Sequence, residues 1–161
     1  MEDKEFFMKE AIKEAKKAYS KDEVPIGAVI VKDGKIIARG HNLKETKKDT
    51  VKHAEIIAIE KASKKIDAWR LEDCDIYVTM EPCPMCMGAI INSRIRKIYY
   101  GVEDYKAGAC GSVVDLTKYK FNHIPEYEKN LLEEECKEVL QNFFKELRVK
   151  KKKDRGANIE N

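Results

Sequence analysis

Two cysteines three positions apart, Cys83 and Cys86, open an apolar run in the sequence MEPCPMCMGAI (residues 80–90). Pro82 and Pro84 flank Cys83, and since proline is tolerated in the first turn of a helix, we expect the pair at a helix N-terminus. Both side chains can there reach one ion, and the helix dipole favours the thiolate form that binds metal. The pair alone fits a redox centre, half of a structural zinc site or two ligands of a catalytic metal.

His53 is the candidate third ligand because it opens a second expected helix, in the sequence KHAEIIAIE. A catalytic zinc takes thiolate and imidazole ligands, with three ligands from the protein and one position left for water. Glu55, two residues after His53, is placed to reach such a water and to act as a general acid and base. A structural zinc site would need a fourth ligand, and Cys74 has no partner at the required spacing.

The remaining cysteines and histidines are expected outside the metal site. Cys74 begins an expected strand, Cys110 falls in a glycine-rich loop and Cys136 lies on a helix stripe, so each is predicted as a structural thiol. His41 and His123 lack metal-ligand spacing to the pair. An odd count of 5 cysteines also argues against a disulfide framework.

Hydrophobic periodicity predicts the elements that must position these residues. Helices are expected over residues 3–20, 51–66, 82–93 and 131–148, strands over 26–31, 35–38, 75–80 and 97–100, and loops over 41–52 and 101–112. The helix starts that carry His53 and Cys83 should meet at the carboxyl edge of a sheet, where sites tend to form. The order of elements predicts an α/β domain with a mixed sheet covered by helices.

The length of 161 residues suits one domain with one core. The N-terminus lacks the basic and apolar regions of a secretory signal, and no apolar stretch is long enough to span a bilayer. We therefore expect a cytoplasmic protein with reduced thiols. The net charge of +3 is concentrated in RVKKKKDR (residues 148–155). Such a tail suggests attraction to phosphate, although a solvated, frayed terminus is the simpler explanation of the tail alone.

His53-Ala54-Glu55 together with Pro82-Cys83-Pro84-Met85-Cys86 matches the known signature of zinc-dependent nucleobase deaminases. The chain thus resembles the cytidine deaminase superfamily and, within it, the bacterial tRNA-specific adenosine deaminases. The likeness covers residues 5–148 and includes EVPIGAV (23–29), GHN (40–42), GVEDYKAGACGS (101–112), FNH (121–123) and FF (143–144). It implies a three-layer α/β/α fold with a mixed five-stranded sheet and a deaminase domain over 1–148. For residues 149–161, outside the likeness, the composition predicts a basic, disordered tail.

The resemblance implies hydrolytic deamination of the wobble adenosine in a tRNA anticodon loop to inosine, with release of ammonia. One Zn2+ per subunit would be held by His53, Cys83 and Cys86, and Glu55 would transfer the protons. The implied substrate contacts are Asn42, Ala54, Asp104, Lys106, Asn122, His123 and Phe144. The implied partners are the anticodon stem-loop of tRNA-Arg with A at the wobble position and a second copy in a homodimer, with no membrane.

Three alternatives stay open from the sequence. A deaminase of a free nucleobase or nucleoside, of guanine or cytosine type, would share the zinc motif but would not need a cationic end. A non-catalytic, zinc-stabilised interaction module would not need Glu55 and would fill the fourth zinc position with a protein ligand. A redox protein would bind no metal at Cys83 and Cys86.

Overall fold

The computed structural model describes the backbone of residues 2–160 and the side chains of residues 3–156. The helices are α1 (Glu2–Ser20), α2 (Lys44–Lys47), α3 (Ala54–Ile66), α4 (Pro84–Asn92) and α5 (Glu133–Glu160), with a short 3-10 helix at Leu116–Lys118. The strands are β1 (Gly27–Lys32), β2 (Lys35–His41), β3 (Cys74–Met80), β4 (Lys97–Val102) and β5 (Glu126–Glu128). Every helix and strand predicted from periodicity is present, whereas α2, β5 and the 3-10 helix are additional.

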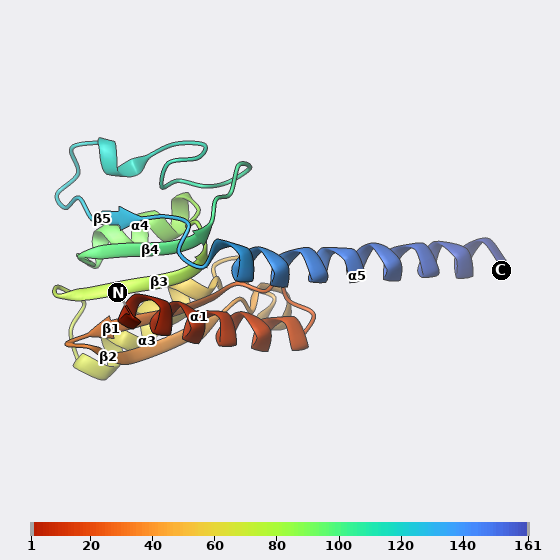
Figure 1. The fold of residues 1–161 in the computed structure, drawn as a ribbon, viewed down its shortest axis with the longest axis horizontal. Helices are drawn as coiled ribbons and strands as arrows, with labels where there is room; N and C mark the ends of the chain where they lie inside the picture. Colours follow the sequence, from red (N-terminus) through yellow and green to blue (C-terminus); the bar gives the residue numbers. More distant parts are fainter. Residues whose placement is uncertain (1, 161) are drawn as a thin grey trace.

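The five strands form one mixed sheet in the order β2-β1-β3-β4-β5 (Figure 1). Strand β1 pairs antiparallel with both β2 and β3, whereas β3, β4 and β5 run parallel to one another. Because β3 and β4 are parallel, the chain between them must cross over, and α4 makes that crossover. The mixed five-stranded sheet implied by the resemblance is therefore confirmed.

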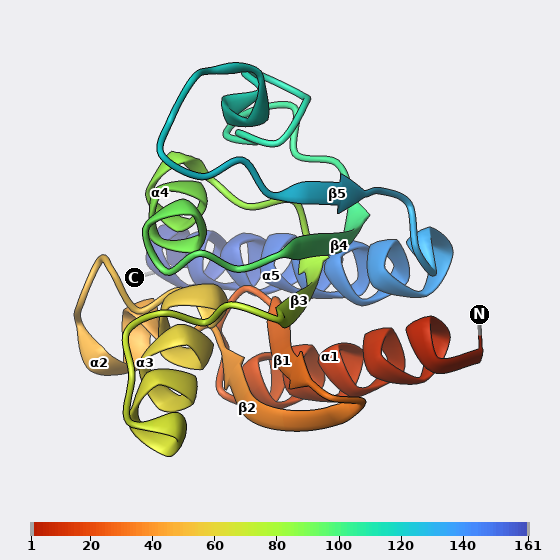
Figure 2. The same ribbon diagram turned by 90° about the vertical axis from the view of Figure 1, so that its left-hand side faces the viewer.

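Helices cover both faces of the sheet, so that the domain has three layers (Figure 2). Side chains alternate along each strand: Ile76 and Val78 pack in one cluster with α3 and α4, whereas Tyr77 packs in the other with α1 and α5. The predicted three-layer α/β/α fold is confirmed. Gly40 on β2 lets α3 approach closely, because a Cβ there would collide with the carbonyl oxygen of Ala54. This contact fixes the start of α3, where the predicted metal ligand His53 lies.

Two of the elements that periodicity missed, α2 and β5, are both short and polar. Strand β5 is only three residues long and reads EYE, so it has no run of alternating residues to detect. Helix α2 reads KETK and has no buried residue of its own. It is held by Glu23, whose carboxylate accepts the backbone N–H groups of Glu45 and Thr46. The expectation of an unbroken loop over 41–52 was therefore wrong.

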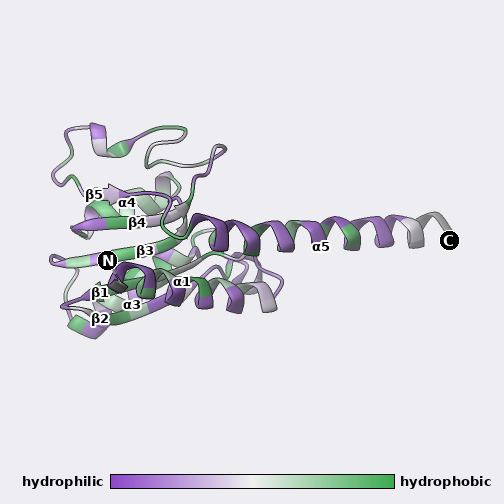
Figure 3. Ribbon diagram, in the orientation of Figure 1, coloured by the Kyte–Doolittle hydropathy of each residue, from purple (hydrophilic) through white to green (hydrophobic). Residues whose placement is uncertain are grey.

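Helix α5 is longer than predicted, because it continues past residue 148 to Glu160 (Figure 1). The part of the tail that we expected to be disordered is thus helical in the structure, in keeping with a run of lysines that favour helix and no proline. Cys136, Leu140 and Phe143 face the domain, but all described side chains from residue 148 to 156 are exposed. Most of this extension is hydrophilic (Figure 3). Neither α5 nor another helix in the described part of the chain is apolar enough to cross a bilayer.

Candidate metal centre and active site

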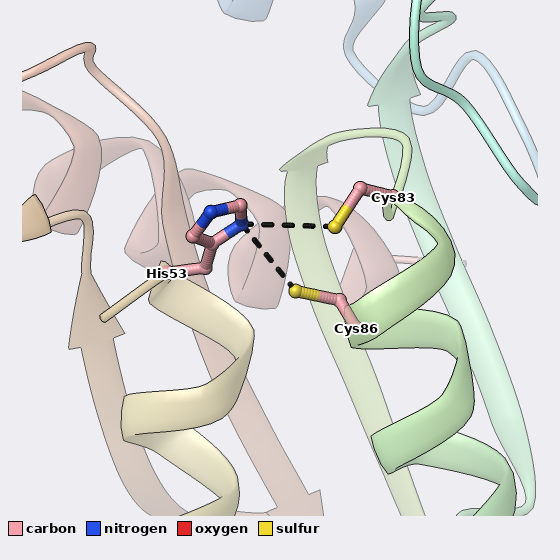
Figure 4. A group of neighbouring side chains, drawn as sticks. All are labelled: His53, Cys83 and Cys86. Carbon is pink, nitrogen blue, oxygen red and sulfur yellow. Dashed lines mark hydrogen bonds between the residues drawn. The ribbon is translucent and has the colours of Figure 1, made fainter. Parts of the chain in front are cut away.

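Two helix N-termini bring the three predicted metal ligands together (Figure 4). His53 is the N-cap residue of α3, Cys83 is the N-cap residue of α4, and Cys86 lies in the first turn of α4. Nδ1 of His53 lies 3.8 Å from Sγ of Cys83 and 3.6 Å from Sγ of Cys86. The three ligand atoms all lie within 4.8 Å of one another. The ligand set predicted from the sequence is thus assembled around one point.

The distances in this cluster fit a tetrahedral zinc ion. With bonds of about 2.3 Å to sulfur and about 2.0–2.1 Å to nitrogen, tetrahedral geometry places the two ligand atoms about 3.6 Å apart. The soft thiolates and the imidazole also suit zinc better than a hard cation. Among the described residues the cluster has three members, His53, Cys83 and Cys86. Three protein ligands leave one position for water, which is the arrangement of a catalytic rather than a structural zinc.

The protonation states of the cluster favour metal binding. Hydrogen bonds with Cys86 and His53 outweigh burial and lower the pKa of the Cys83 thiol to about 4. The pKa of Cys86 is raised, first by its hydrogen bond with Cys83 and then by burial. The hydrogen bond with Cys83 also raises the pKa of His53. One thiolate is therefore formed in advance, and a metal that binds both sulfurs must displace the proton of Cys86.

Glu55 is the second residue of α3 and is almost completely buried beside the cluster. Burial, and after it the charge on Cys83, raises the pKa of this carboxyl group to about 7, against the opposing effect of His53. A carboxyl group with a pKa near neutrality can both take and give a proton. Its position and its acidity therefore suit the role of general acid and base.

A pocket of about 170 Å³ opens onto the cluster and is partly enclosed. It is lined by Val24, Ile26, Asn42, Lys44, His53, Ala54, Glu55, Met80, Glu81, Cys83, Asp104 and Ala107. Of the residues predicted to contact the substrate, Asn42, Ala54 and Asp104 lie in this pocket together with the catalytic candidate Glu55. They come from separate places in the chain, so the fold and not local sequence brings them together.

Asn42 and Ala54 present polar groups to this pocket. The Asn42 side chain is buried, and it donates to the carbonyl oxygen of Val24 at 3.4 Å and accepts the N–H of Lys44 at 3.4 Å. Both bonds are long, so the amide is oriented but not strongly bound. Ala54 is the first residue of α3, and its N–H therefore has no acceptor within the helix. Both groups are available to a polar substrate.

Asp104 and Ala107 belong to a loop that lines one part of the pocket. Oδ1 of Asp104 accepts the backbone N–H groups of Lys106 at 3.0 Å and Ala107 at 3.1 Å. Part of the hydrogen-bonding capacity of Asp104 is thus used within its own loop. Glu81 also lines the pocket, although it was not predicted as a site residue from the sequence. The feature of the sequence that could have indicated Glu81 is its position, since it is an acidic residue directly between a buried strand and Pro82-Cys83.

Lys106 and Phe144 lie next to this pocket and not within it. Both line a wider groove that runs along α5, and Met80 belongs to the lining of both hollows. Lys145, Arg148 and Lys151 line the same groove. Phe144 is 40% exposed there. The groove therefore offers an aromatic side chain among basic ones beside the pocket.

Asn122 and His123 lie in a different hollow, beside Arg70, Arg94 and Arg96. The His123 ring donates through Nε2 to the carbonyl oxygen of Ile95 at 2.6 Å. Neither residue lines the pocket above the metal cluster. The structure thus separates these two from the other predicted substrate contacts.

The three remaining cysteines are free, buried thiols outside the metal cluster, as predicted. Burial raises the pKa of Cys74, Cys110 and Cys136, which keeps them protonated. A buried, protonated thiol behaves as a small apolar side chain. None of the three therefore competes with Cys83 and Cys86 for the metal.

Comparison with known proteins links this geometry to a family. The model of the MafB19-like deaminase family matches residues 1–148. A tRNA-specific adenosine deaminase of Bacillus subtilis is 53% identical over 149 residues, which cover 92% of each chain. One of Aquifex aeolicus is 46% identical over 146 residues, covering 90% of this chain and 96% of the relative.

Two solved structures of deaminases share the fold of this chain. One comes from biochemical and structural studies of A-to-I editing by tRNA:A34 deaminases at the wobble position of transfer RNA. It superposes with a TM-score of 0.80 at 44% identity and covers 84% of this chain and 99% of its own. The guanine deaminase of Bacillus subtilis superposes with a TM-score of 0.61 at 41% identity, over 77% of this chain and 83% of its own.

Proposed function

The chain belongs to the family of tRNA-specific adenosine deaminases, and from that membership we propose that it hydrolyses the wobble adenosine of a tRNA anticodon loop to inosine. The observation that carries the proposal is the position of Glu55. Its carboxyl group is buried beside His53, Cys83 and Cys86 and lines the pocket that opens above them. Proton transfer and metal chemistry are thus available at one point.

His53, Cys83 and Cys86 are the residues that would hold zinc, since their distances and ligand types fit it. When bound, zinc supplies Lewis-acid activation of water at neutral pH. Glu55 takes one proton from the attacking water and delivers it to N1 of the purine. The water oxygen forms a bond to C6, the second proton goes to the amino group, and the bond from C6 to that nitrogen breaks to release ammonia. The atoms of adenosine and water are thereby all found in inosine and ammonia.

Asn42 and Ala54 hold the base in place for this step. The Asn42 amide carries both a donor and an acceptor, so it can pair with the polar edge of a purine. The backbone N–H of Ala54 points from the start of α3 and donates to the group at C6. To reach these groups, the wobble base must leave its stack and enter the pocket, which costs little in a single-stranded loop.

The groove along α5 is the surface on which we place the rest of the anticodon loop. Aromatic side chains stack on unpaired bases, and basic side chains neutralise the backbone. Phe144, Lys106 and Arg148 supply both kinds of group beside the pocket. The specific substrate that we propose is tRNA-Arg with adenosine at the wobble position. Asn122 and His123 would contact RNA only outside the pocket of their own subunit.

We further propose that the chain acts as a homodimer in the cytoplasm. Support comes from one segment, residues 112–125, that leaves several large apolar side chains exposed, namely Val113, Val114, Tyr119, Phe121 and Ile124. A concentration of exposed apolar groups is typical of an interaction surface. Light scattering on the purified protein tests this, because a monomer at micromolar concentration would contradict it.

A free-base deaminase is the second candidate, favoured by the likeness to a guanine deaminase. One assay separates the two activities. The purified protein is incubated with a tRNA-Arg anticodon stem-loop, free adenosine, guanine and cytosine, with Glu55→Ala as control. RNA editing is supported if inosine forms in the stem-loop, if the free compounds are not deaminated, and if the product is absent with Glu55→Ala. Release of ammonia from a free base, with no change in the stem-loop, would overturn it.

A further inference from the structure

Glu81 is a buried carboxylate that the chemistry above does not use. It follows the last residue of β3 and precedes Pro82 and the metal ligand Cys83. Only 3% of its surface is exposed, and within the described residues no lysine or arginine pairs with it. A charge buried without a cation requires several hydrogen-bond donors.

All donors to Glu81 come from the loop that forms one wall of the pocket. Oε1 accepts the backbone N–H of Asp104 at 3.0 Å. Oε2 accepts the backbone N–H of Cys110 at 2.9 Å and of Ser112 at 3.1 Å, and the Ser112 hydroxyl donates to Oε1. The carboxylate thus holds both ends of the segment 104–112. Charge-assisted bonds of this kind are about twice as strong as neutral ones.

Two further contacts join the same loop to the residues around Glu81. The N–H of Ala109 donates to the carbonyl oxygen of Pro82 at 2.9 Å, directly before Cys83. Gly108 passes so close to Glu81 that a Cβ at this position would collide with the carboxylate. Only glycine therefore lets the loop close fully onto Glu81. One short stretch, Glu81-Pro82-Cys83, carries both the anchor of the loop and a metal ligand.

We propose that Glu81 is a positioning residue that fixes the distance between the metal site and the pocket wall formed by Asp104 and Ala107. This rests on the proposed function in assuming that the base enters that pocket. Glu81 is not a member of the metal cluster, and both of its carboxylate oxygens accept hydrogen bonds from the loop. Its effect should therefore fall on how well the base is held, not on the proton transfer that Glu55 performs.

Two variants should weaken the contact between Glu81 and the 104–112 loop, one by changing the acceptor and the other by changing the loop. Glu81→Gln removes one acceptor oxygen and sets an NH2 group against a backbone donor, whereas Gly108→Ala leaves the carboxylate intact and pushes the loop away. Glu138→Gln, an exposed site on α5, is the matched control. For both loop variants we expect KM for the stem-loop to rise roughly tenfold, kcat to change by less than about twofold, and zinc content to stay the same. The double variant should be no worse than either single one.

Amide hydrogen exchange gives a second measurement that does not depend on activity. The N–H groups of Asp104, Cys110 and Ser112 should exchange faster in Glu81→Gln than in the wild type or in Glu138→Gln. Unchanged amide exchange together with an unchanged KM would overturn the proposal. A parallel loss of zinc, kcat and folded protein would also overturn it, because that is the result expected of a merely structural role. If the stem-loop is not a substrate of the wild type, the proposed function fails, and exchange at these three amides still decides the role of Glu81.

Discussion

Nδ1 of His53 lies 3.6 Å from Sγ of Cys86, although the two residues belong to different helices on the same face of the sheet. The contact exists because α3 and α4 both begin at one edge of the sheet. A metal held between them would join the two helix starts. Metal binding at this point would therefore be coupled to folding.

Removal of the metal is expected to lower stability and abolish turnover. With zinc about 100-fold above its Kd, binding stabilises the folded state by about 2.7 kcal/mol, which is roughly 5–10 °C in Tm for a domain of this size. Adding a chelator should lower the Tm of the wild type by that amount but leave Cys83→Ala unaffected. Cys136→Ala, at a buried thiol outside the cluster, should keep its zinc. A chelator effect equal in wild type and Cys83→Ala would contradict a site at Cys83.

Glu55→Gln should retain metal and fold but lose kcat. The substitution keeps the shape of the side chain and removes the group that carries protons, which contributes about 10²–10⁴-fold to rate. Because the carboxyl group is buried, the neutral amide should not lower Tm. Glu60→Gln, at an exposed position on the same helix, is the control for activity. Turnover by Glu55→Gln within tenfold of the wild type would exclude Glu55 as the proton carrier.

Glu23 is expected to make stability depend on pH in the acid range. Burial raises its pKa, but the hydroxyl of Thr46, which donates at 2.6 Å, and the amides of Thr46 and Glu45 outweigh burial and hold the pKa below 4.5. Since the folded value lies below the unfolded one, the stabilisation is complete above about pH 4.5 and is lost as pH falls through the folded value.

Urea unfolding of Glu23→Gln tests this dependence. At pH 7 the variant should be less stable than the wild type by about 1–3 kcal/mol, because the bonds to the charged carboxylate are weakened. The difference should shrink as the pH is lowered from 5 to 3. A difference that is the same at every pH would show that Glu23 acts through packing alone.

The cluster of His53, Cys83 and Cys86 could be predicted from the sequence because both helix starts carry local signals. His53 and Cys83 stand at helix starts, and helix starts follow from local periodicity and proline. The pairing of those starts follows from the α/β layering. The main strands could be predicted equally well, since each has a run of apolar residues that ends in polar ones.

The features that could not be predicted depend on contacts between distant parts of the chain. Helix α2 is held by Glu23, and the pocket wall is held by Glu81. A sequence shows an acidic residue at each place but not the amides that surround it in the fold. The resemblance, in turn, implied that Asn122 and His123 contact the substrate. It did not indicate that they line a hollow apart from the pocket above the metal cluster.

Deletion of residues 149–161 should weaken RNA binding and make it less sensitive to salt. The deleted part of α5 carries Lys150, Lys151, Lys152, Lys153 and Arg155, all exposed. Each phosphate contact contributes about 0.7 to the slope of log K against log salt for a single strand. The slope should fall while kcat at saturating RNA stays constant. Replacing Lys61, Lys64 and Lys65 on α3 by glutamine is the control for general loss of charge. An unchanged slope after deletion would mean that the extension does not contact RNA.

Phe143 and Phe144 are neighbours with opposite expected roles. Phe143 is buried and packs edge-on against Tyr19 with ring centroids 5.7 Å apart, whereas Phe144 is 40% exposed in the groove. Phe144→Leu should reduce affinity for the stem-loop roughly 5- to 150-fold at constant Tm, since stacking on a base contributes about 1–3 kcal/mol. Phe143→Leu should lower the free energy of unfolding by about 1 kcal/mol with little effect on RNA affinity. If Phe144→Leu instead lowers Tm as much as Phe143→Leu does and leaves affinity unchanged, Phe144 packs within the protein and the bases beside the wobble position must stack elsewhere.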